Sequence, residues 1–247
     1  MGQILAFLSG KGGTGKSSLC AAMATDLATS GNRVLCIDCA VGLPNLDIPL
    51  GMASEGCISF LDVCRGDYSV TQAAVHPNFP LLQLLTAPIH CLPEHIDEAA
   101  FAALLQQAQQ QFDYILLDAP AGIGTMFTLA ARYAHRCLVI TLPDPSAVRT
   151  ARQVGQTLEL MDKQDVRLIV NRVNEKMLRA MKWTIDDIVD NTGLQLLGLL
   201  PVDTDLLEAA AHNLPLVLHN ARGAYAAVQR ICLRMEGHPV KIPSRSF

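Results

Sequence analysis

The sequence predicts an α/β fold: a doubly wound, mostly parallel sheet with helices on both faces. Short apolar runs of about four to eight residues, bounded by Gly, Pro, Asp or Asn, alternate with longer amphipathic stretches along the chain. The short runs are apolar at nearly every position, which is typical of strands that helices cover on both sides. Because strands and helices alternate, right-handed crossovers should connect them into a parallel sheet.

The expected elements follow in chain order. The strands are Ile4–Ser9, Arg33–Asp38, Leu81–Leu85, Tyr114–Asp118, Cys137–Thr141, Arg167–Asn171 and Gln195–Leu200, and the helices are Lys16–Ser30, Glu94–Phe112, Ser146–Met161, Glu175–Asn191 and Ala221–Met235. No linker rich in Pro, Gly or Ser divides them, so we expect one domain over residues 1–236 and a tail over 237–247.

The composition fits a compact chain with a large core. Half of the residues are hydrophobic and 17% are charged, and 19 Lys and Arg against 23 Asp and Glu give a net charge of −4. That balance argues against a basic surface for nucleic acid. No apolar run reaches the roughly 18 residues that cross a bilayer, and the N-terminal run is too short for an export signal. We therefore expect a cytoplasmic protein whose eight cysteines are reduced.

A glycine-rich loop lies between the first strand and the first helix. It fits the pattern G-x-x-x-x-G-K-[ST] without a mismatch, through Gly10, Lys11, Gly12, Gly13, Thr14, Gly15, Lys16 and Ser17. Glycines let successive backbone N–H groups face phosphate oxygens, and the helix N-terminus adds a positive dipole. In this pattern the lysine reaches the β- and γ-phosphates and the serine hydroxyl ligates Mg²⁺. The loop predicts a site for a nucleoside triphosphate.

Two carboxylates end neighbouring apolar strands. Asp118 should project beside the phosphate loop and hold Mg²⁺ through water, and Asp38 is the other acid able to face the metal. Asp118 capping the next helix is the alternative interpretation. Gly122 and Gly124 give the segment after Asp118 freedom to move when a γ-phosphate arrives or leaves.

The loop continues as Lys-Gly-Gly-Thr-Gly-Lys-Ser-Ser over residues 11–18, which resembles the deviant Walker A loop of the ParA/MinD family of P-loop ATPases. The resemblance extends over nearly the whole chain and is closer to the MinD branch. Residues 37–47 resemble switch I, and 112–122 resemble the Walker B strand with switch II. Residues 143–149, 170–172 and 197–203 resemble three later family segments.

This resemblance implies roles for individual residues. Lys11 would reach across a dimer interface to the nucleotide of the other subunit. Lys11, Lys16 and Asp38 are the implied catalytic residues, and Ser17, Asp38 and Asp118 the implied metal site. The nucleotide contacts would come from the loop Gly10 to Ser18, from Asn171 and Arg172 at the adenine, and from Pro201, Val202 and Asp203 over the base.

Two departures from the family pattern change what is expected. Switch I in the family carries a second Asp two residues after Asp38, which helps position the attacking water, and here Ala40 stands in its place. We expect ATP hydrolysis to be slow or to depend on a partner. The tail holds Pro239 and Pro243 where MinD proteins carry a basic amphipathic helix. Direct membrane binding is therefore not expected, although a partner can still recruit the chain.

The resemblance implies an ATP-binding switch that forms a homodimer with ATP and Mg²⁺. It would position cell-division machinery or another cargo with the help of a protein activator or adaptor. A metallocentre chaperone that carries iron–sulfur or nickel through Cys36 and Cys39 is an alternative, and a non-hydrolysing scaffold is another. His90, Cys91 and His95 are more simply a turn before a helix than a metal site.

Overall fold

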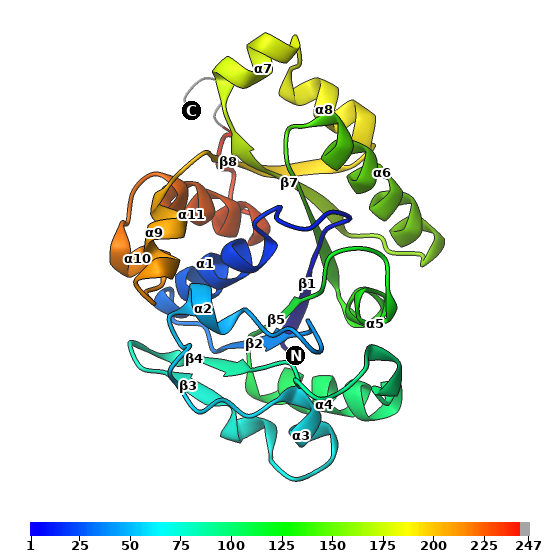
Figure 1. The fold of residues 1–247 in the computed structure, drawn as a ribbon, viewed down its shortest axis with the longest axis vertical. Helices are drawn as coiled ribbons and strands as arrows, with labels where there is room; N and C mark the ends of the chain where they lie inside the picture. The colour runs from blue at the N-terminus through cyan, green and yellow to red at the C-terminus, as the bar shows by residue number, and fades with distance from the viewer. Residues whose placement is uncertain (243–247) are drawn as a thin grey trace.

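A computed structural model describes residues 1–242. One sheet of eight strands runs through the molecule in the order β3-β4-β2-β5-β1-β6-β7-β8 (Figure 1). The strands are β1 Gln3–Leu8, β2 Val34–Asp38, β3 Ala74–His76, β4 Phe79–Leu85, β5 Tyr114–Asp118, β6 Arg136–Thr141, β7 Val166–Val173 and β8 Gln195–Pro201. All neighbouring strands pair in parallel except β3, which is antiparallel to β4.

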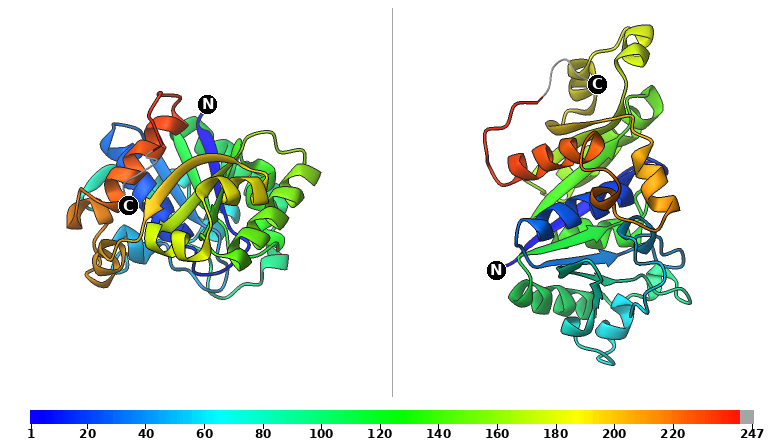
Figure 2. Two further views of the ribbon diagram at one scale, coloured as in Figure 1. Left: turned by 90° about the horizontal axis from the view of Figure 1, so that it is seen from above. Right: turned by 90° about the vertical axis from the view of Figure 1, so that its left-hand side faces the viewer.

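Helices cover both faces of the sheet, and Figure 2 shows the strands running between them. The α-helices are α1 Lys16–Thr29, α2 Asp47–Leu50, α3 Phe60–Cys64, α4 Glu98–Gln111, α5 Thr125–Tyr133, α6 Pro145–Leu160, α7 Glu175–Met181, α8 Ile185–Thr192, α9 Asp205–Ala211, α10 Leu216–His219 and α11 Ala224–Met235. One core cluster joins the sheet to α1 and α11, and a second joins its other face to α4, α5 and α6. The predicted doubly wound α/β fold is confirmed.

The seven predicted strands are confirmed to within two residues at each end. The eighth strand, β3, was not predicted. It has three residues and forms the antiparallel edge of the sheet through a short connection at residues 77–78. A run this short carries too few side chains for a period-2 pattern to be recognised.

Several predicted helices have different boundaries. The helix expected over 175–191 is two helices, because Lys182 takes a left-handed conformation with φ of 55° and ends α7. Thr184 and Asp187 then start α8 with a capping box. The helix expected from Glu94 starts at Glu98, where the Asp97 carboxylate accepts the N–H groups of the first turn. The helix expected over 221–235 starts at residue 224, and five helices, α2, α3, α5, α9 and α10, were not predicted.

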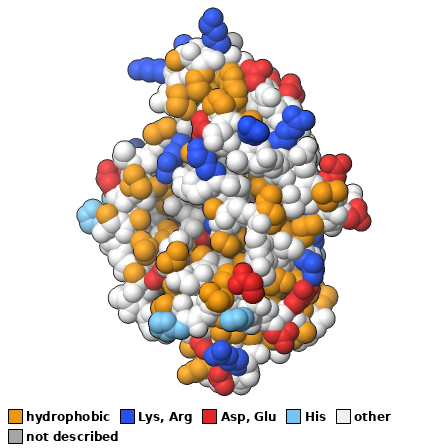
Figure 3. Space-filling model, turned by 45° about the vertical axis from the view of Figure 1, so that its right-hand side comes forward, with side chains coloured by type: hydrophobic (Ala, Val, Ile, Leu, Met, Phe, Trp, Pro, Cys, Tyr) orange, Lys and Arg blue, Asp and Glu red, His pale blue; other side chains and the backbone are white. Residues whose placement is uncertain are grey.

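The first part of the C-terminal tail folds back onto the domain. The Arg234 guanidinium donates to the carbonyl oxygens of Val240 and Lys241, at 3.4 and 3.2 Å. Ile242 packs on the apolar cluster of α7 and α8, at the top of Figure 3, where part of that cluster faces solvent. The remainder of the predicted tail, 243–247, lies outside the described residues. Within residues 1–242, no helix is long and apolar enough to cross a membrane.

The packing of α11 on β8 depends on Gly198. A Cβ atom there would lie 2.3 Å from Ile231 Cγ1, inside the van der Waals contact distance. We expect Gly198→Ala to lower the free energy of unfolding by about 1–3 kcal/mol, because α11 must shift to make room. Urea denaturation measures this. Gly56→Ala is the matched control, since a Cβ at Gly56 meets nothing within 4 Å. Equal stability of the two variants would contradict this account of the packing.

Candidate nucleotide site

The glycine-rich loop connects β1 to α1 at the carboxyl edge of the sheet, as predicted. Gly13 and Gly15 have φ values of 75° and 85°, which residues with a side chain rarely adopt. Gly15 is also the residue before the first turn of α1, and no side chain of residues 1–242 caps that turn. The free N–H groups and the helix dipole therefore face the cleft above the loop, as anion binding requires.

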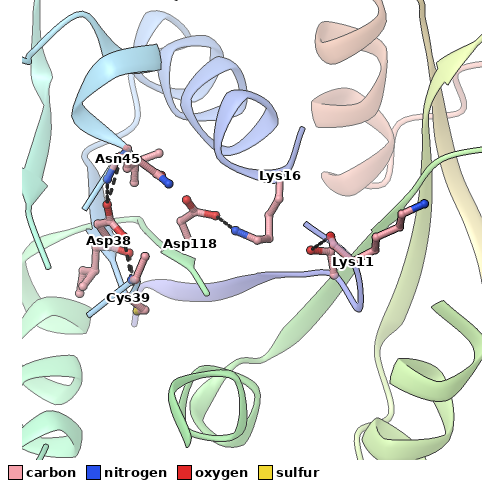
Figure 4. A network of polar contacts seen from close by, with 10 residues as sticks. Lys11, Lys16, Asp38, Cys39, Asn45 and Asp118 are labelled. Atoms are coloured by element: carbon pink, nitrogen blue, oxygen red, sulfur yellow. Dashed lines mark hydrogen bonds and ion pairs between the residues drawn. The ribbon is translucent and has the colours of Figure 1, made fainter. Parts of the chain in front are cut away.

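A buried ion pair lies at the centre of the site. Lys16 Nζ donates to Asp118 Oδ1 at 2.6 Å, and both side chains are almost fully buried (Figure 4). The other carboxylate oxygen, Asp118 Oδ2, is buried and accepts no hydrogen bond within the described part of the chain, and the same holds for Thr14 Oγ1. Buried polar atoms normally have partners. Two such atoms beside a lysine fit a site that takes a phosphate and a hydrated cation.

Asp38 organises the switch I segment in this structure. Its Oδ1 accepts the N–H of Ala40 at 2.8 Å, and its Oδ2 accepts those of Asn45 and Leu46 at 2.8 and 3.0 Å. Burial raises the pKa of Asp38, and the charge of Asp118 on the adjacent strand raises it further, while these three hydrogen bonds oppose the shift. The sequence predicted Asp38 beside the metal site but gave no sign of this loop-holding role.

Asn171 and Arg172 lie near the carboxyl end of β7, where its pairing with β8 is irregular between Val170 and Val173. Asn171 Nδ2 donates to the carbonyl oxygen of Thr14 at 2.8 Å, so the amide holds the phosphate loop. It also fills the space beside Gly15, where a Cβ would lie 2.3 Å from Asn171 Nδ2. Arg172 has a φ of 55° and its side chain lines the cleft.

The three residues expected over the base lie further out. Pro201 ends β8, and Val202 is more than half exposed. Asp203 uses its carboxylate within the fold: it accepts the N–H of Asp205 at 3.0 Å and that of Ala224 at 2.7 Å, which caps α11. These residues are absent from the lining of the cleft in the described chain.

Lys11 also stands apart from the cleft. Its ammonium lies 3.5 Å from Asp144 Oδ1 at the start of α6, and its side chain is 42% exposed. Figure 4 shows Lys11 directed away from Lys16, toward the opposite side of the loop. Gly10 packs against Thr150 of α6, where a Cβ would lie 2.8 Å from the Thr150 Cβ. Within one chain, therefore, the Lys11 side chain does not reach the phosphate cradle, the part of the cleft formed by the glycine-rich loop.

The cleft above the loop has a volume of about 530 Å³. Phosphate-loop residues form its floor. Its walls include Ala40 and Asn45 from switch I, Pro120 and Ala121 from the segment after Asp118, and Arg172. Sequence analysis did not identify its apolar rim, where Leu43 is 80% exposed and Ile48 is 45% exposed. Leu43 and Ile48 lie in and just after the segment that resembles switch I, but the sequence alone does not show that their side chains are exposed.

The cysteine pair proposed for a metal lies on two faces of the sheet. Cys36 belongs to the core beside α1, and Cys39 belongs to the core beside α4 and α5. Both are fully buried, and burial raises the pKa of the Cys39 thiol. Residues 36 and 39 are therefore unable to share one metal ion. In the described residues, His90, Cys91 and His95 do not gather their donor atoms either.

Comparison with known proteins gives this fold a family. The family model described as "CobQ/CobB/MinD/ParA nucleotide binding domain" matches residues 5–216. The chain belongs to this family. As a member of the CobQ/CobB/MinD/ParA family, it is 33% identical over 243 residues to the septum site-determining protein MinD of Synechocystis sp., which covers 97% of this chain and 91% of that protein. It is 32% identical over 246 residues to MinD of Bacillus subtilis, with 98% and 92% covered.

Solved structures of this family give the same result. The chain superposes on the "MinC:MinD cell division protein complex" of Aquifex aeolicus with a TM-score of 0.89 and 32% sequence identity, over 99% of both chains. A second structure, the MinD cell division protein of Aquifex aeolicus, gives a TM-score of 0.87 and 31% identity. The predicted resemblance to the ParA/MinD family, and to its MinD branch, is confirmed.

The loop-holding role of Asp38 can be tested with Asp38→Asn. An amide has one acceptor oxygen in place of two, so at least one of the N–H groups of Ala40, Asn45 and Leu46 loses its acceptor. We expect hydrogen exchange of the amides over 40–46 to accelerate by about tenfold or more, as loss of a hydrogen bond worth roughly 1–3 kcal/mol implies. Hydrogen exchange of this segment is the right measurement because the free energy of unfolding mixes two effects. Losing a hydrogen bond lowers it, whereas removing a buried charge raises it.

Asp47→Asn is the control for this prediction, since it makes the same isosteric change at the half-buried first residue of α2. The amides over 40–46 in this variant should exchange hydrogen at the same rate as in the unmodified protein. If both variants left that segment equally protected, Asp38 would not be the residue that holds switch I.

Proposed function

We propose that this chain is a MinD-like ATP-binding switch that forms a homodimer with ATP and Mg²⁺ and positions cell-division machinery or another cargo. The observation that carries the proposal is the phosphate loop on the uncapped end of α1, with the Lys16–Asp118 pair and two unpaired buried oxygens beside it. The family match and the identity to septum site-determining MinD proteins support the same function.

The phosphates of ATP fit the loop by charge and by shape. The N–H groups over residues 12–17 and the α1 dipole supply the anion site, and Lys16 would exchange the Asp118 carboxylate for β- and γ-phosphate oxygens. The carboxylate released in this way needs a new cation, because an unpaired buried charge is costly. Nucleotide binding therefore couples directly to the environment of Asp118.

Residues around that carboxylate suit Mg²⁺. Ser17 and Asp118 would hold it, with Asp38 nearby on the adjacent strand, because Mg²⁺ favours a few oxygen ligands and retained waters. When bound, the cation neutralises charge that develops on the transferred phosphoryl group. The chain's own contribution is to orient the phosphates with the loop and to exclude water under switch I.

The exposed position of Lys11 supports a dimer. Its ammonium lies outside the phosphate loop of its own chain, and within residues 1–242 its one ion pair is the partly exposed contact with Asp144. An exposed pair of this kind contributes roughly 0–1 kcal/mol, so Lys11 can leave it at little cost. In a face-to-face dimer the lysine would reach the nucleotide of the partner, and the apolar rim at Leu43 and Ile48 would be covered.

A protein partner and the route to a membrane are further parts of the proposal. The Aquifex aeolicus structure is a complex of MinD with MinC, which supports a protein adaptor for this chain. Ile242 packs on the domain, and the tail has no regular helix over 236–242. We infer that recruitment to a membrane would occur through a partner, and that nucleic acid is not a ligand at a net charge of −4.

Molar mass by light scattering tests the dimer. We expect a 26.6 kDa monomer with ADP and Mg²⁺, and a doubling of the mass with ATP and Mg²⁺. Lys11→Ala should bind ATP but stay monomeric, because the contact to the second nucleotide is lost. Lys176→Ala, which removes the same charge from an exposed position on α7, should dimerise normally. A monomer with ATP in the parent chain, or a dimer in Lys11→Ala, would contradict the face-to-face arrangement.

The rate of hydrolysis tests the role of position 40. Ala40 lines the cleft and has no group able to orient water. We expect Ala40→Asp to increase the rate of ATP hydrolysis by about tenfold or more, since positioned acid–base groups contribute at least that much. The affinity for ATP should stay unchanged. Ala40→Leu controls for the added bulk, and a rise in rate in both variants, or in neither, would refute the explanation.

A further inference from the structure

Three side chains able to ligate a metal ion lie close together on α9 and α10, and α9 also lines the nucleotide cleft. Asp205 and Glu208 come from the first turns of α9, and His219 is the last residue of α10. One donor atom from each of the three lies within 4.8 Å of the other two. Asp205 and Glu208 are three positions apart on one helix, so they share a face, and the loop at 212–215 returns the chain to bring His219 opposite them.

The spacing between the donor atoms suits a metal ion better than a shared proton. His219 Nε2 lies 3.5 Å from Glu208 Oε2 and 3.9 Å from Asp205 Oδ1. Charge-assisted hydrogen bonds between such groups are about 2.7–2.9 Å long, so neither pair is within that length. Ligand atoms on a tetrahedral Zn²⁺ at about 2.0–2.2 Å from the metal are roughly 3.3–3.5 Å apart. The donor oxygens of Asp205 and Glu208 lie within 4.8 Å of each other, so side-chain rotations that draw the three donor atoms together would complete the coordination.

The surroundings also hold the ligands in place. Asn220 Nδ2 donates to Asp205 Oδ2, which leaves Oδ1 directed at His219. Such a hydrogen bond to a ligating carboxylate is the usual outer-shell support of a metal site. His219 and Asp205 are each 23% exposed, while Glu208 is 56% exposed. The site is thus half-buried, with one open side for water as a fourth ligand. The helix dipole favours acids in the first turn of α9, but it does not explain a histidine from α10 facing both.

We propose that Asp205, Glu208 and His219 form a binding site for a divalent transition-metal ion of the Zn²⁺ class. One imidazole nitrogen with two carboxylate oxygens is a donor set that Zn²⁺ accepts and that Mg²⁺ does not favour. This site is separate from the phosphate cradle, and its test does not depend on nucleotide.

A metal ion there would fasten α9 to α10 beside the nucleotide cleft. Ala210 of α9 lines the cleft, and α9 packs on α2. In the loop between α9 and α10, Asn213 Oδ1 accepts the N–H of Ala53 at 3.3 Å, and a Cβ at Gly51 would lie 2.8 Å from the Asn213 carbonyl oxygen. The metal would therefore stabilise the helix pair that supports the segment after switch I.

Cobalt titration of the reduced, untagged, nucleotide-free protein tests the site, because the absorption of bound Co²⁺ reports its ligands. We expect one Co²⁺ per chain, with visible bands of a nitrogen and oxygen site and without thiolate-to-metal charge transfer. Zn²⁺ should displace it. His219→Gln and Glu208→Gln should each weaken binding by about tenfold or more. Circular dichroism confirms that the variants are folded.

His238→Gln is the matched control, because His238 Nε2 lies 3.9 Å from Glu236 Oε2 but faces one carboxylate instead of two. It should bind Co²⁺ like the parent chain. Hydrogen exchange over 205–219 should slow with Zn²⁺ in the parent and in this control, but not in His219→Gln. The proposal is overturned if Co²⁺ does not bind, if its spectrum shows thiolate ligands, if His219→Gln binds as tightly as the parent, or if Zn²⁺ leaves the exchange unchanged.

Discussion

The ion pair between Lys16 and Asp118 is the interaction on which the site depends. It joins the end of the phosphate loop to the end of β5, and both side chains are buried. Removing one partner of a buried pair typically costs about 3–5 kcal/mol, because the other charge stays behind without compensation. Lys16 therefore needs another anion before it can leave Asp118. A phosphate supplies that anion, so the same contact that stabilises the free protein also makes the site responsive to ligand.

Parallel pairing of the central strands brings the separate parts of the site together. Phe7 of β1 and Asp38 of β2 are both register partners of Asp118 in β5, so three chain segments reach the same edge at the same level. Close packing then limits the residues at the loop. Gly15 has no room for a side chain beside Asn171, and Asn171 in turn holds the Thr14 carbonyl. The cradle is thus shaped from two sides, by the glycines of the loop and by an amide from β7.

The chain differs from the family pattern at Ala40 and in its C-terminal tail, and these two differences affect different parts of the proposed function. Ala40 lies in the wall of the cleft and has no group that can orient the attacking water, so it is expected to affect the rate of hydrolysis. Arg234 of α11 binds the carbonyl oxygens of Val240 and Lys241, and Ile242 packs on the cluster of α7 and α8, so the position of the tail concerns the proposed recruitment. Neither touches the Lys16–Asp118 pair. In the proposed function, nucleotide binding is therefore retained, while the rate of hydrolysis and the location of the protein depend on other proteins.

The sequence by itself determined the α/β class, seven of the strands and the phosphate loop. Local patterns are sufficient to predict these features, because an apolar run, the spacing of glycines and the position of one lysine each involve only a few neighbouring residues. It also placed Asp38, Asp118 and Asn171 at strand ends, where a parallel sheet collects ligand-binding residues. Only the tertiary structure decided what these side chains contact. Asp38 holds switch I, Asp118 pairs with Lys16, and Asn171 supports the loop, because each contact joins residues that the pattern along the chain does not relate.

Tertiary structure also decided between interpretations that the sequence left open. Cys36 and Cys39 look like a metal-binding pair in the chain, but the alternation of side chains around β2 puts them in cores on opposite faces of the sheet. Asp205, Glu208 and His219 show no motif, since eleven positions separate the histidine from the nearer acid, yet a turn between two short helices gathers them. Spacing along the chain predicts proximity only within one regular element. Between elements, the packing of the fold determines it.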